Sequence, residues 1–126
     1  MFFLSETLGL YVHIPFCRSK CDYCDFYSLA GCEARMDDYL RALLAHLTEC
    51  APRAAGFSVD TVYFGGGTPS YFGEKRLVAA LKRIGKHYKV AKDAEVTLEA
   101  NPDSVEEKML KRLRRAGFTR LSLGMQ

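Results

Sequence analysis

Four short β-rich runs alternate with three longer stretches of helical periodicity along the 126-residue chain. This alternation limits the folds open to the chain more than any other feature. The predicted strands are 9–14, 59–64, 94–99 and 120–124, and the predicted helices are 33–51, 74–88 and one that follows Ser104. Strands joined through helices of about ten residues or more form right-handed βαβ units and a parallel sheet. The sequence therefore predicts an α/β fold, with a sheet that is either open or closed as a barrel.

The ends of the third predicted helix are marked by specific residues. Ser104 and Glu107 have the spacing of a capping box, in which each side chain bonds the backbone of the other residue. Gly117 stands where a helix commonly ends, because glycine readily adopts the left-handed conformation of a helix terminus. We therefore expect this helix to begin directly after Ser104 and to end before Gly117.

Three cysteines follow the first predicted strand with the spacing C-x-x-x-C-x-x-C, namely Cys17, Cys21 and Cys24. Thiolates are soft ligands that suit iron–sulfur clusters, zinc and copper(I). A four-iron cluster for simple electron transfer takes four thiolates, so three would leave one iron open to a small molecule. A zinc site completed by His13 is the alternative, although the sequence has no second C-x-x-C or paired histidines. Cys32 and Cys50 are expected not to be ligands.

Two other strand ends bear residues that suit a ligand. Gly65-Gly66-Gly67-Thr68-Pro69 follows the second strand, and glycines let a backbone approach a ligand closely, although a tight turn would also use them. Glu99 ends the third strand, and its carboxylate could accept hydrogen bonds from a ribose diol or simply face water. Ligands bind at the carboxyl ends of parallel strands. We therefore expect one site at this edge.

The cysteine motif and its flanks, residues 11–16 (YVHIPF) and 25–28 (DFYS), resemble the cluster loop of the radical S-adenosylmethionine (SAM) superfamily. Within it, they are similar to the oxygen-independent coproporphyrinogen III oxidases and their haem-chaperone relatives of the HemW type. The resemblance implies that residues 1–126 are the N-terminal part of a radical SAM core domain. Such a domain is a partial (βα)6 TIM-like barrel, of which about four βα steps would be present. We therefore expect a truncated product that folds poorly alone, with its fourth strand as an exposed edge.

The resemblance also implies cofactors and the residues that hold them. A 4Fe–4S cluster would be bound by Cys17, Cys21 and Cys24, and would cleave SAM to a radical that abstracts hydrogen from a substrate. The implied SAM contacts are Gly66, Gly67 and Thr68 to the amino-acid part, Glu99 to the ribose, Tyr23 near the adenine, and Tyr11 and Gln126 beside the cofactor. Tyr11 and Tyr23 could equally be packing aromatics.

The branch of the family is indicated by residue 26. The oxidases usually have a further cysteine two residues after the third cluster cysteine, whereas this chain has Phe26. The departure favours the haem chaperones, with haem binding and transfer to acceptor proteins by the full-length protein. Oxidation of coproporphyrinogen is the alternative, and a passive iron–sulfur, electron-transfer or zinc module is a third hypothesis.

Composition excludes several other classes of protein. With 48% hydrophobic and 26% charged residues, the chain resembles an ordinary globular protein. A net charge of +3 without a basic and aromatic stripe argues against nucleic-acid binding. No apolar run approaches the roughly eighteen residues that span a membrane. Three clustered cysteines suit a reducing compartment, so the predicted location is the cytoplasm.

Overall fold

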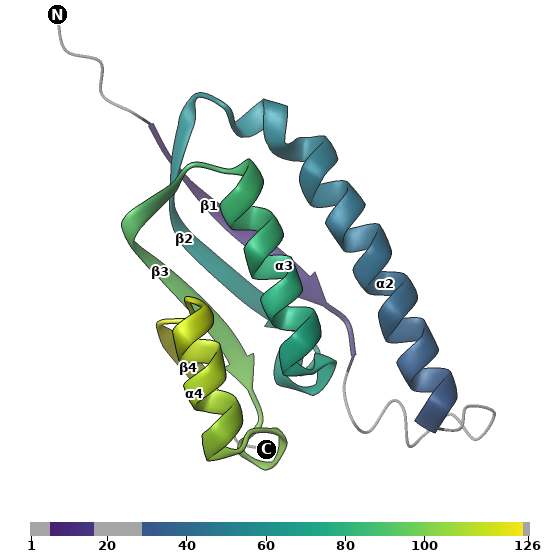
Figure 1. Ribbon diagram of the computed structural model, residues 1–126. Helices are drawn as coiled ribbons and strands as arrows, with labels where there is room; N and C mark the ends of the chain where they lie inside the picture. The colour runs from purple at the N-terminus through teal and green to yellow at the C-terminus, as the bar shows by residue number, and fades with distance from the viewer. Residues whose placement is uncertain (1–5, 17–28, 125–126) are drawn as a thin grey trace, which may run out of the picture.

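The computed structural model describes residues 6–16 and 29–124, with residues 29–32 described by their backbone alone (Figure 1). Strands and helices alternate as predicted. In chain order they are β1 (Glu6–Ile14), α2 (Leu29–Cys50), β2 (Phe57–Gly66), α3 (Glu74–His87), β3 (Val90–Ala100), α4 (Glu107–Ala116) and β4 (Arg120–Leu123). Short 3-10 helices follow three of them: η1 (Ala51–Ala54), η2 (Pro69–Phe72) and η3 (Pro102–Ser104). The strands β1 and β3 begin several residues earlier than the alternating sequence pattern indicated.

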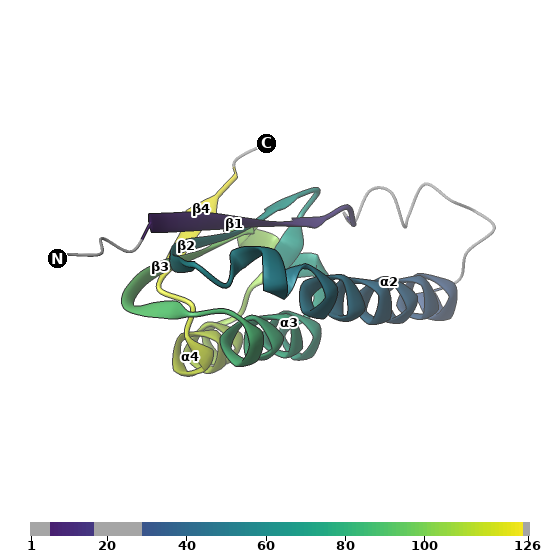
Figure 2. The ribbon, with the colours of Figure 1, turned by 90° about the horizontal axis from the view of Figure 1, so that it is seen from above.

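The four strands form one parallel sheet in the order β1-β2-β3-β4. The helices α2, α3 and α4 lie together on one side of it, as the view along the sheet shows (Figure 2). The predicted parallel α/β architecture is therefore confirmed. In the described part of the chain β4 is an edge strand, and its Leu121 and Leu123 remain 37% and 54% exposed.

The core fills the space between the sheet and the helices. Phe64 of β2 and Leu98 of β3 are fully buried there, in the same hydrophobic cluster as Leu77 and Ile84 of α3. The ring of Phe64 also packs against Phe118, with the ring centroids 5.2 Å apart. Each such side chain contributes about 1.5–3 kcal/mol by leaving water, so this layer holds the strands in register.

The opposite face of the sheet is polar. Side chains alternate between the two faces along a strand, so residues two apart share a face. The strand register pairs Tyr11 with Tyr63, Tyr63 with Thr97, and Glu99 with Ser122, which places these five side chains on the face that the described helices leave uncovered. Parallel sheets are usually covered on both faces. This face is therefore suited to contact a ligand or further polypeptide.

The predicted capping box does not form. Helix α4 begins at Glu107, with Glu106 as its N-cap and no side-chain cap. Ser104 lies in η3 instead, where its hydroxyl donates to the carbonyl of Asn101 at 2.6 Å. The Asn101 side chain accepts from the Asp103 amide at 3.1 Å, and this local turn competes with the helix for the same residues.

The end of α4 agrees with the sequence. Gly117 has a φ of +124°, and its N–H donates to the carbonyls of Leu113 and Arg114. This left-handed terminus confirms the predicted stop signal. Among the described helices, none is both long and apolar enough to cross a membrane.

Candidate functional site

The carboxylate of Glu99 lies at the carboxyl edge of the sheet and is held by two donors from β2. The Tyr63 hydroxyl donates to Oε2 at 2.7 Å, and the Gly66 N–H donates to Oε1 at 3.0 Å. The hydrogen bond to Glu99, followed by desolvation, raises the pKa of Tyr63 above its ordinary value of 10.0. Tyr63 therefore remains a donor at neutral pH. Because a carboxylate offers about four lone-pair sites, Glu99 can accept further hydrogen bonds from a ligand.

Two tyrosines flank this carboxylate. The rings of Tyr11 and Tyr63 stack with their centroids 6.0 Å apart and their planes 13° apart. The Tyr11 hydroxyl lies 3.3 Å from Nδ1 of His13, within hydrogen-bonding distance. Tyr11 is 60% exposed, so much of its aromatic surface is free to contact a flat ligand group.

The convergence of these side chains depends on a glycine. A Cβ atom at Gly65 would lie 2.9 Å from the Tyr11 hydroxyl oxygen and from Cε1 of Tyr63, and 3.0 Å from Oε1 of Glu99. These separations are shorter than ordinary contacts. A larger residue at position 65 would therefore push apart the three groups that form the site.

The next residues fasten β2 to the segment that precedes Cys17. The Gly67 N–H donates to the Ile14 carbonyl at 2.9 Å, and the Thr68 N–H donates to the Phe16 carbonyl at 2.7 Å. All three amides from Gly66 to Thr68 thus have acceptors within the protein. Contacts between this segment and a ligand would therefore use the carbonyls of the glycines or the hydroxyl of Thr68.

A cleft of about 180 Å³ opens at the ends of β3 and β4. Its walls are formed by Gly67, Thr68, Glu99, Ala100, Asn101, Ser122 and Gly124. Complete ligand pockets usually measure about 300–1,000 Å³, so this cleft would enclose only part of a nucleoside-sized ligand. Larger hollows of about 470 and 720 Å³ lie on the helical side. We favour the smaller cleft because the strand-end polar groups converge there.

A serine pair connects the two loops that form this cleft. Ser70 of η2 is buried, and its hydroxyl contacts the hydroxyl of Ser104 in η3. The Ser70 oxygen also accepts from the Asn101 amide at 3.3 Å. The glycine segment after β2 and the Asn101-Pro102 turn after β3 are therefore held at a constant separation.

The structure brings together five of the predicted site residues, namely Tyr11, Gly66, Gly67, Thr68 and Glu99. The other five lie outside the described residues: Cys17, Cys21, Cys24, Tyr23 and Gln126. Among the side chains that the structure describes, those of residues 6–16 and 33–124, His, Cys, Asp and Glu do not gather in a group of three or more that could hold a metal. Both metal hypotheses, the cluster and the zinc site, therefore depend on the predicted cysteine ligands Cys17, Cys21 and Cys24.

Tyr63 and Ser70 were missed by the sequence reasoning, and Gly65 was identified only as part of the glycine segment. The signal for Tyr63 and Gly65 was their two-residue spacing, which places them on the same sheet face. Nothing local marks Ser70, because its partners are more than thirty residues away. Cys50, expected not to be a ligand, is half-buried with a free thiol. It is the last residue of the 22-residue helix α2, about 30 Å from the start of that helix.

Comparison with models of protein families matches residues 11–126 to the radical SAM superfamily. The chain belongs to the radical SAM superfamily. The match includes the cysteine motif, the glycine segment after β2 and Glu99. Binding of an iron–sulfur cluster and of SAM is general to this superfamily.

Several relatives of this radical SAM chain have names that concern haem. The heme chaperone HemW of Mycobacterium tuberculosis is 43% identical over 124 residues, which cover 96% of this chain and 32% of that protein. HemW of Escherichia coli is 42% identical over 121 residues, or 94% of this chain and 32% of that protein. The oxygen-independent coproporphyrinogen III oxidase of E. coli is 37% identical over 122 residues, which cover 96% of this chain and 27% of that protein. The chain thus spans 32% of the length of the two HemW proteins and 27% of that of the oxidase.

A solved structure confirms the fold class. The coproporphyrinogen III oxidase HemN from E. coli, described as a radical SAM enzyme, matches with a TM-score of 0.82 and 35% sequence identity. The match covers 97% of this chain and 28% of that one. The parallel sheet and its helices correspond to the N-terminal part of that radical SAM fold, and in the described residues the sheet is not closed.

Proposed function

We propose that this chain binds a 4Fe–4S cluster through Cys17, Cys21 and Cys24, and SAM at the carboxyl edge of its sheet. Residues 1–126 would form the N-terminal part of a radical SAM core domain. The observation that carries the proposal is the placement of Glu99, held by Tyr63 and Gly66 at the edge where the segment leading to Cys17 begins.

The described residues fit the polar and aromatic parts of SAM. Glu99 has acceptor sites left for the ribose hydroxyls, and the exposed ring of Tyr11 offers a surface beside it. The cleft beside Gly67 and Thr68 would take part of the ligand. Tyr23 near the adenine and Gln126 remain predictions from the family resemblance. When bound, the cluster and SAM together would supply a one-electron reductive cleavage of a carbon–sulfur bond.

We favour the haem-chaperone branch for the whole protein. Phe26 stands where the oxidases usually have a cysteine, and the two HemW relatives above are more similar in sequence than the oxidase. Haem and haem-acceptor proteins would then be its partners. Oxidation of coproporphyrinogen is the second candidate, which the similarity to HemN supports. We also propose a cytoplasmic location, because a thiolate-bound cluster requires a reducing compartment.

Anaerobic reconstitution tests the cofactor proposal. The protein at its natural length should take up four irons per chain, as expected of a cubane cluster, and should bind SAM. Cys21→Ala should abolish the cluster. Glu99→Gln should lower the affinity for SAM about tenfold, because a carboxylate accepts stronger hydrogen bonds than an amide.

The matched control for Glu99 is Glu95→Gln. Glu95 lies on the same strand and the same face, four residues earlier, and pairs with Arg120 at 3.0 Å. Its substitution should leave SAM affinity unchanged. Stoichiometric zinc with no affinity for SAM would contradict the proposal. Haem titration and a coproporphyrinogen turnover assay then separate the two branches.

A further inference from the structure

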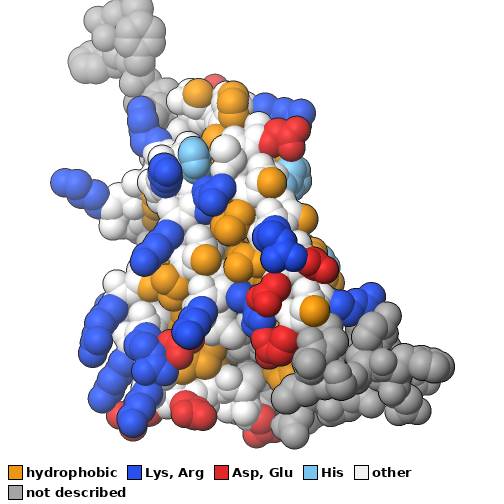
Figure 3. Space-filling view, turned by 45° about the vertical axis from the view of Figure 1, so that its right-hand side comes forward, with side chains coloured by type: hydrophobic (Ala, Val, Ile, Leu, Met, Phe, Trp, Pro, Cys, Tyr) orange, Lys and Arg blue, Asp and Glu red, His pale blue; other side chains and the backbone are white. Residues whose placement is uncertain are grey.

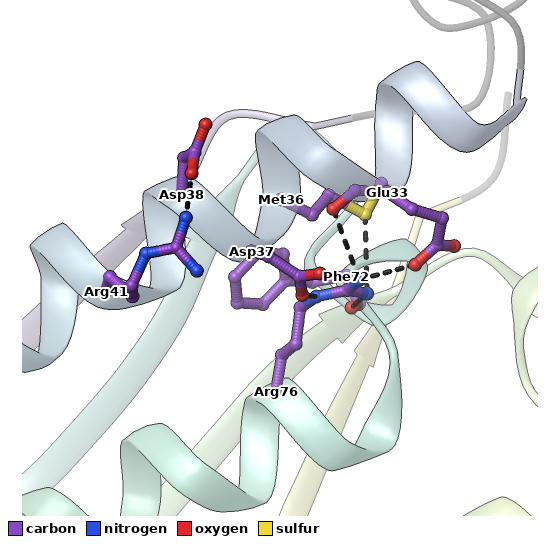
Figure 4. Close-up of polar contacts among 7 residues, drawn as sticks. All are labelled: Glu33, Met36, Asp37, Asp38, Arg41, Phe72 and Arg76. Carbon is purple, nitrogen blue, oxygen red and sulfur yellow. Dashed lines mark hydrogen bonds and ion pairs between the residues drawn. The ribbon is translucent and has the colours of Figure 1, made fainter.

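The two ends of the segment that carries the predicted cluster cysteines are anchored on the same group of side chains. Phe16 is the last described residue before this segment, and α2 is the first described element after it. Phe16, Tyr39 of α2 and Phe72 of η2 pack against one another, and we call these three rings the aromatic platform. Arg76 of α3 is bonded to the platform and to α2 (Figure 4).

The N-terminal end of this segment, at Phe16, is held by ring stacking and by hydrogen bonds to backbone carbonyls. The ring of Phe16 stacks on that of Phe72, with centroids 5.8 Å apart and planes 11° apart. It meets Tyr39 edge-on at 5.5 Å. The Tyr39 hydroxyl donates to the carbonyl of His13, and the Thr68 amide donates to that of Phe16. The chain is thus positioned immediately before Cys17.

The C-terminal end of the segment, where α2 begins, is held by Arg76. Its Nε donates to Oδ1 of Asp37 at 2.9 Å, and its Nη2 pairs with the carboxylate of Glu33 (Figure 4). Its Nη1 donates to the Phe72 carbonyl at 2.9 Å, and its Cζ lies 5.7 Å from the centroid of the Phe72 ring. One guanidinium therefore joins the first turns of α2 to the ring on which Phe16 stacks.

The chemistry of this contact requires arginine. The side chain is only 15% exposed. Burial opposes its charge, but the bonds and charges of Glu33 and Asp37 outweigh that effect and raise the pKa of Arg76. A planar fork of five N–H donors can serve two carboxylates and a carbonyl at once. A lysine has one nitrogen and could reach only some of these acceptors.

We propose that Arg76 is a positioning residue for the cluster: it sets the separation between the two ends of the segment that carries Cys17, Cys21 and Cys24. The inference rests on the proposed function, in which those cysteines are the ligands. Anchored ends reduce the conformational freedom lost when three thiolates meet at one metal cluster. Arg76 touches neither cofactor and would act through Phe72 and α2.

The test compares Arg76→Met with Arg112→Met in the protein at its natural length. Arg112 of α4 also forms an arginine–carboxylate pair, with Glu74 at 2.6 Å between Nη2 and Oε1, but it has no contact with the platform in the described structure. The first measurement needs no cluster. In apoprotein, hydrogen exchange of the Thr68 amide should be about tenfold faster in Arg76→Met, since losing charge-assisted bonds loosens the platform, and unchanged in Arg112→Met.

The second measurement is made on the cluster itself. After reconstitution, Arg76→Met should retain less iron than the wild type and show a shifted reduction potential and electron paramagnetic resonance spectrum. Arg76→Lys should restore part of each change. The double variant Glu33→Gln/Asp37→Asn keeps Arg76 over Phe72 but weakens its tie to α2, so it should reproduce the changes even if Arg76→Met folds badly.

The outcomes separate the two proposals. A wild type that binds no iron refutes the proposed function, and with it the positioning role, whatever the exchange data show. If the wild type binds a cluster, unchanged Thr68 exchange in Arg76→Met overturns the positioning role. A cluster with wild-type iron content, potential and spectrum in that variant also overturns it, as does an equal effect of Arg112→Met.

Discussion

Alanine substitutions along the glycine triplet should separate stability from ligand binding. Gly66 has a φ of +123°, and a Cβ there would lie 2.6 Å from the carbonyl oxygen of Ile14. At Gly67 a Cβ would lie 2.6 Å from the carbonyl oxygen of Phe16, without a positive φ. At Gly65 the atoms in the way are the ends of side chains. A side chain is therefore unfavourable for a different structural reason at each of the three glycines.

The expected losses of unfolding free energy follow from these surroundings. Gly66→Ala combines backbone strain with displacement of a strand, and should cost about 2–5 kcal/mol. Gly67→Ala only displaces backbone, and should cost about 1–3 kcal/mol. Gly65→Ala should cost about 1 kcal/mol, because the atoms in the way belong to the side chains of Tyr11, Tyr63 and Glu99, which can shift. The same movement opens the site, so Gly65→Ala should weaken SAM binding about tenfold.

Urea denaturation and SAM titration of the three variants provide the measurements. Gly85→Ala is the matched control, because Gly85 is exposed in α3 and a Cβ there meets nothing within 4 Å. It should stabilise the protein by about 0.4–1 kcal/mol. The reasoning is refuted if Gly66→Ala unfolds at the wild-type urea concentration, or if Gly65→Ala costs more stability than Gly66→Ala.

Other variants test the core, the site and the helix end. Leu77→Ala should cost about 2–5 kcal/mol in urea unfolding, because this fully buried side chain would leave a cavity; a loss below that of a surface variant would contradict the assigned core. Tyr63→Phe removes the bond to Glu99 and should cost about 1 kcal/mol at pH 8. The raised pKa of Tyr63 means that this contribution is complete below pH 10 and lost as the pH rises through the folded-state value, so the two proteins should converge at alkaline pH. Gly117→Ala should lower the melting temperature, because its φ of +124° strains any other residue by about 1–3 kcal/mol.

Basic side chains dominate one part of the helical surface (Figure 3). Lys75, Lys82, Arg112 and Arg115 line the hollow between α3 and α4, where Glu74 pairs with Arg112. This surface lies on the opposite side of the sheet from the strand-end site (Figure 2). Substitutions of Lys82 should therefore leave SAM binding unchanged.

Local patterns were sufficient to predict the order of the elements and the edge that bears the site. The periodicity of residues such as Leu77 and Ile84 reflects a helix that buries one side, and each run between helices is too short and β-rich for anything but a strand. The carboxyl ends of parallel strands share one edge, so Glu99 and the glycine segment had to lie there together. The cysteine motif pointed to the superfamily because its three cysteines are close in sequence.

Only the tertiary structure decided which groups meet at that edge. The bond from Tyr63 to Glu99 spans 36 residues and depends on the register between β2 and β3. The pairing of Arg76 with Asp37 spans 39 residues and depends on how α3 packs beside α2. The capping box at Ser104 failed because a neighbouring turn used the same hydroxyl. Periodicity depends on near neighbours, which the sequence displays, whereas register and helix packing result from minimising the free energy of the whole core.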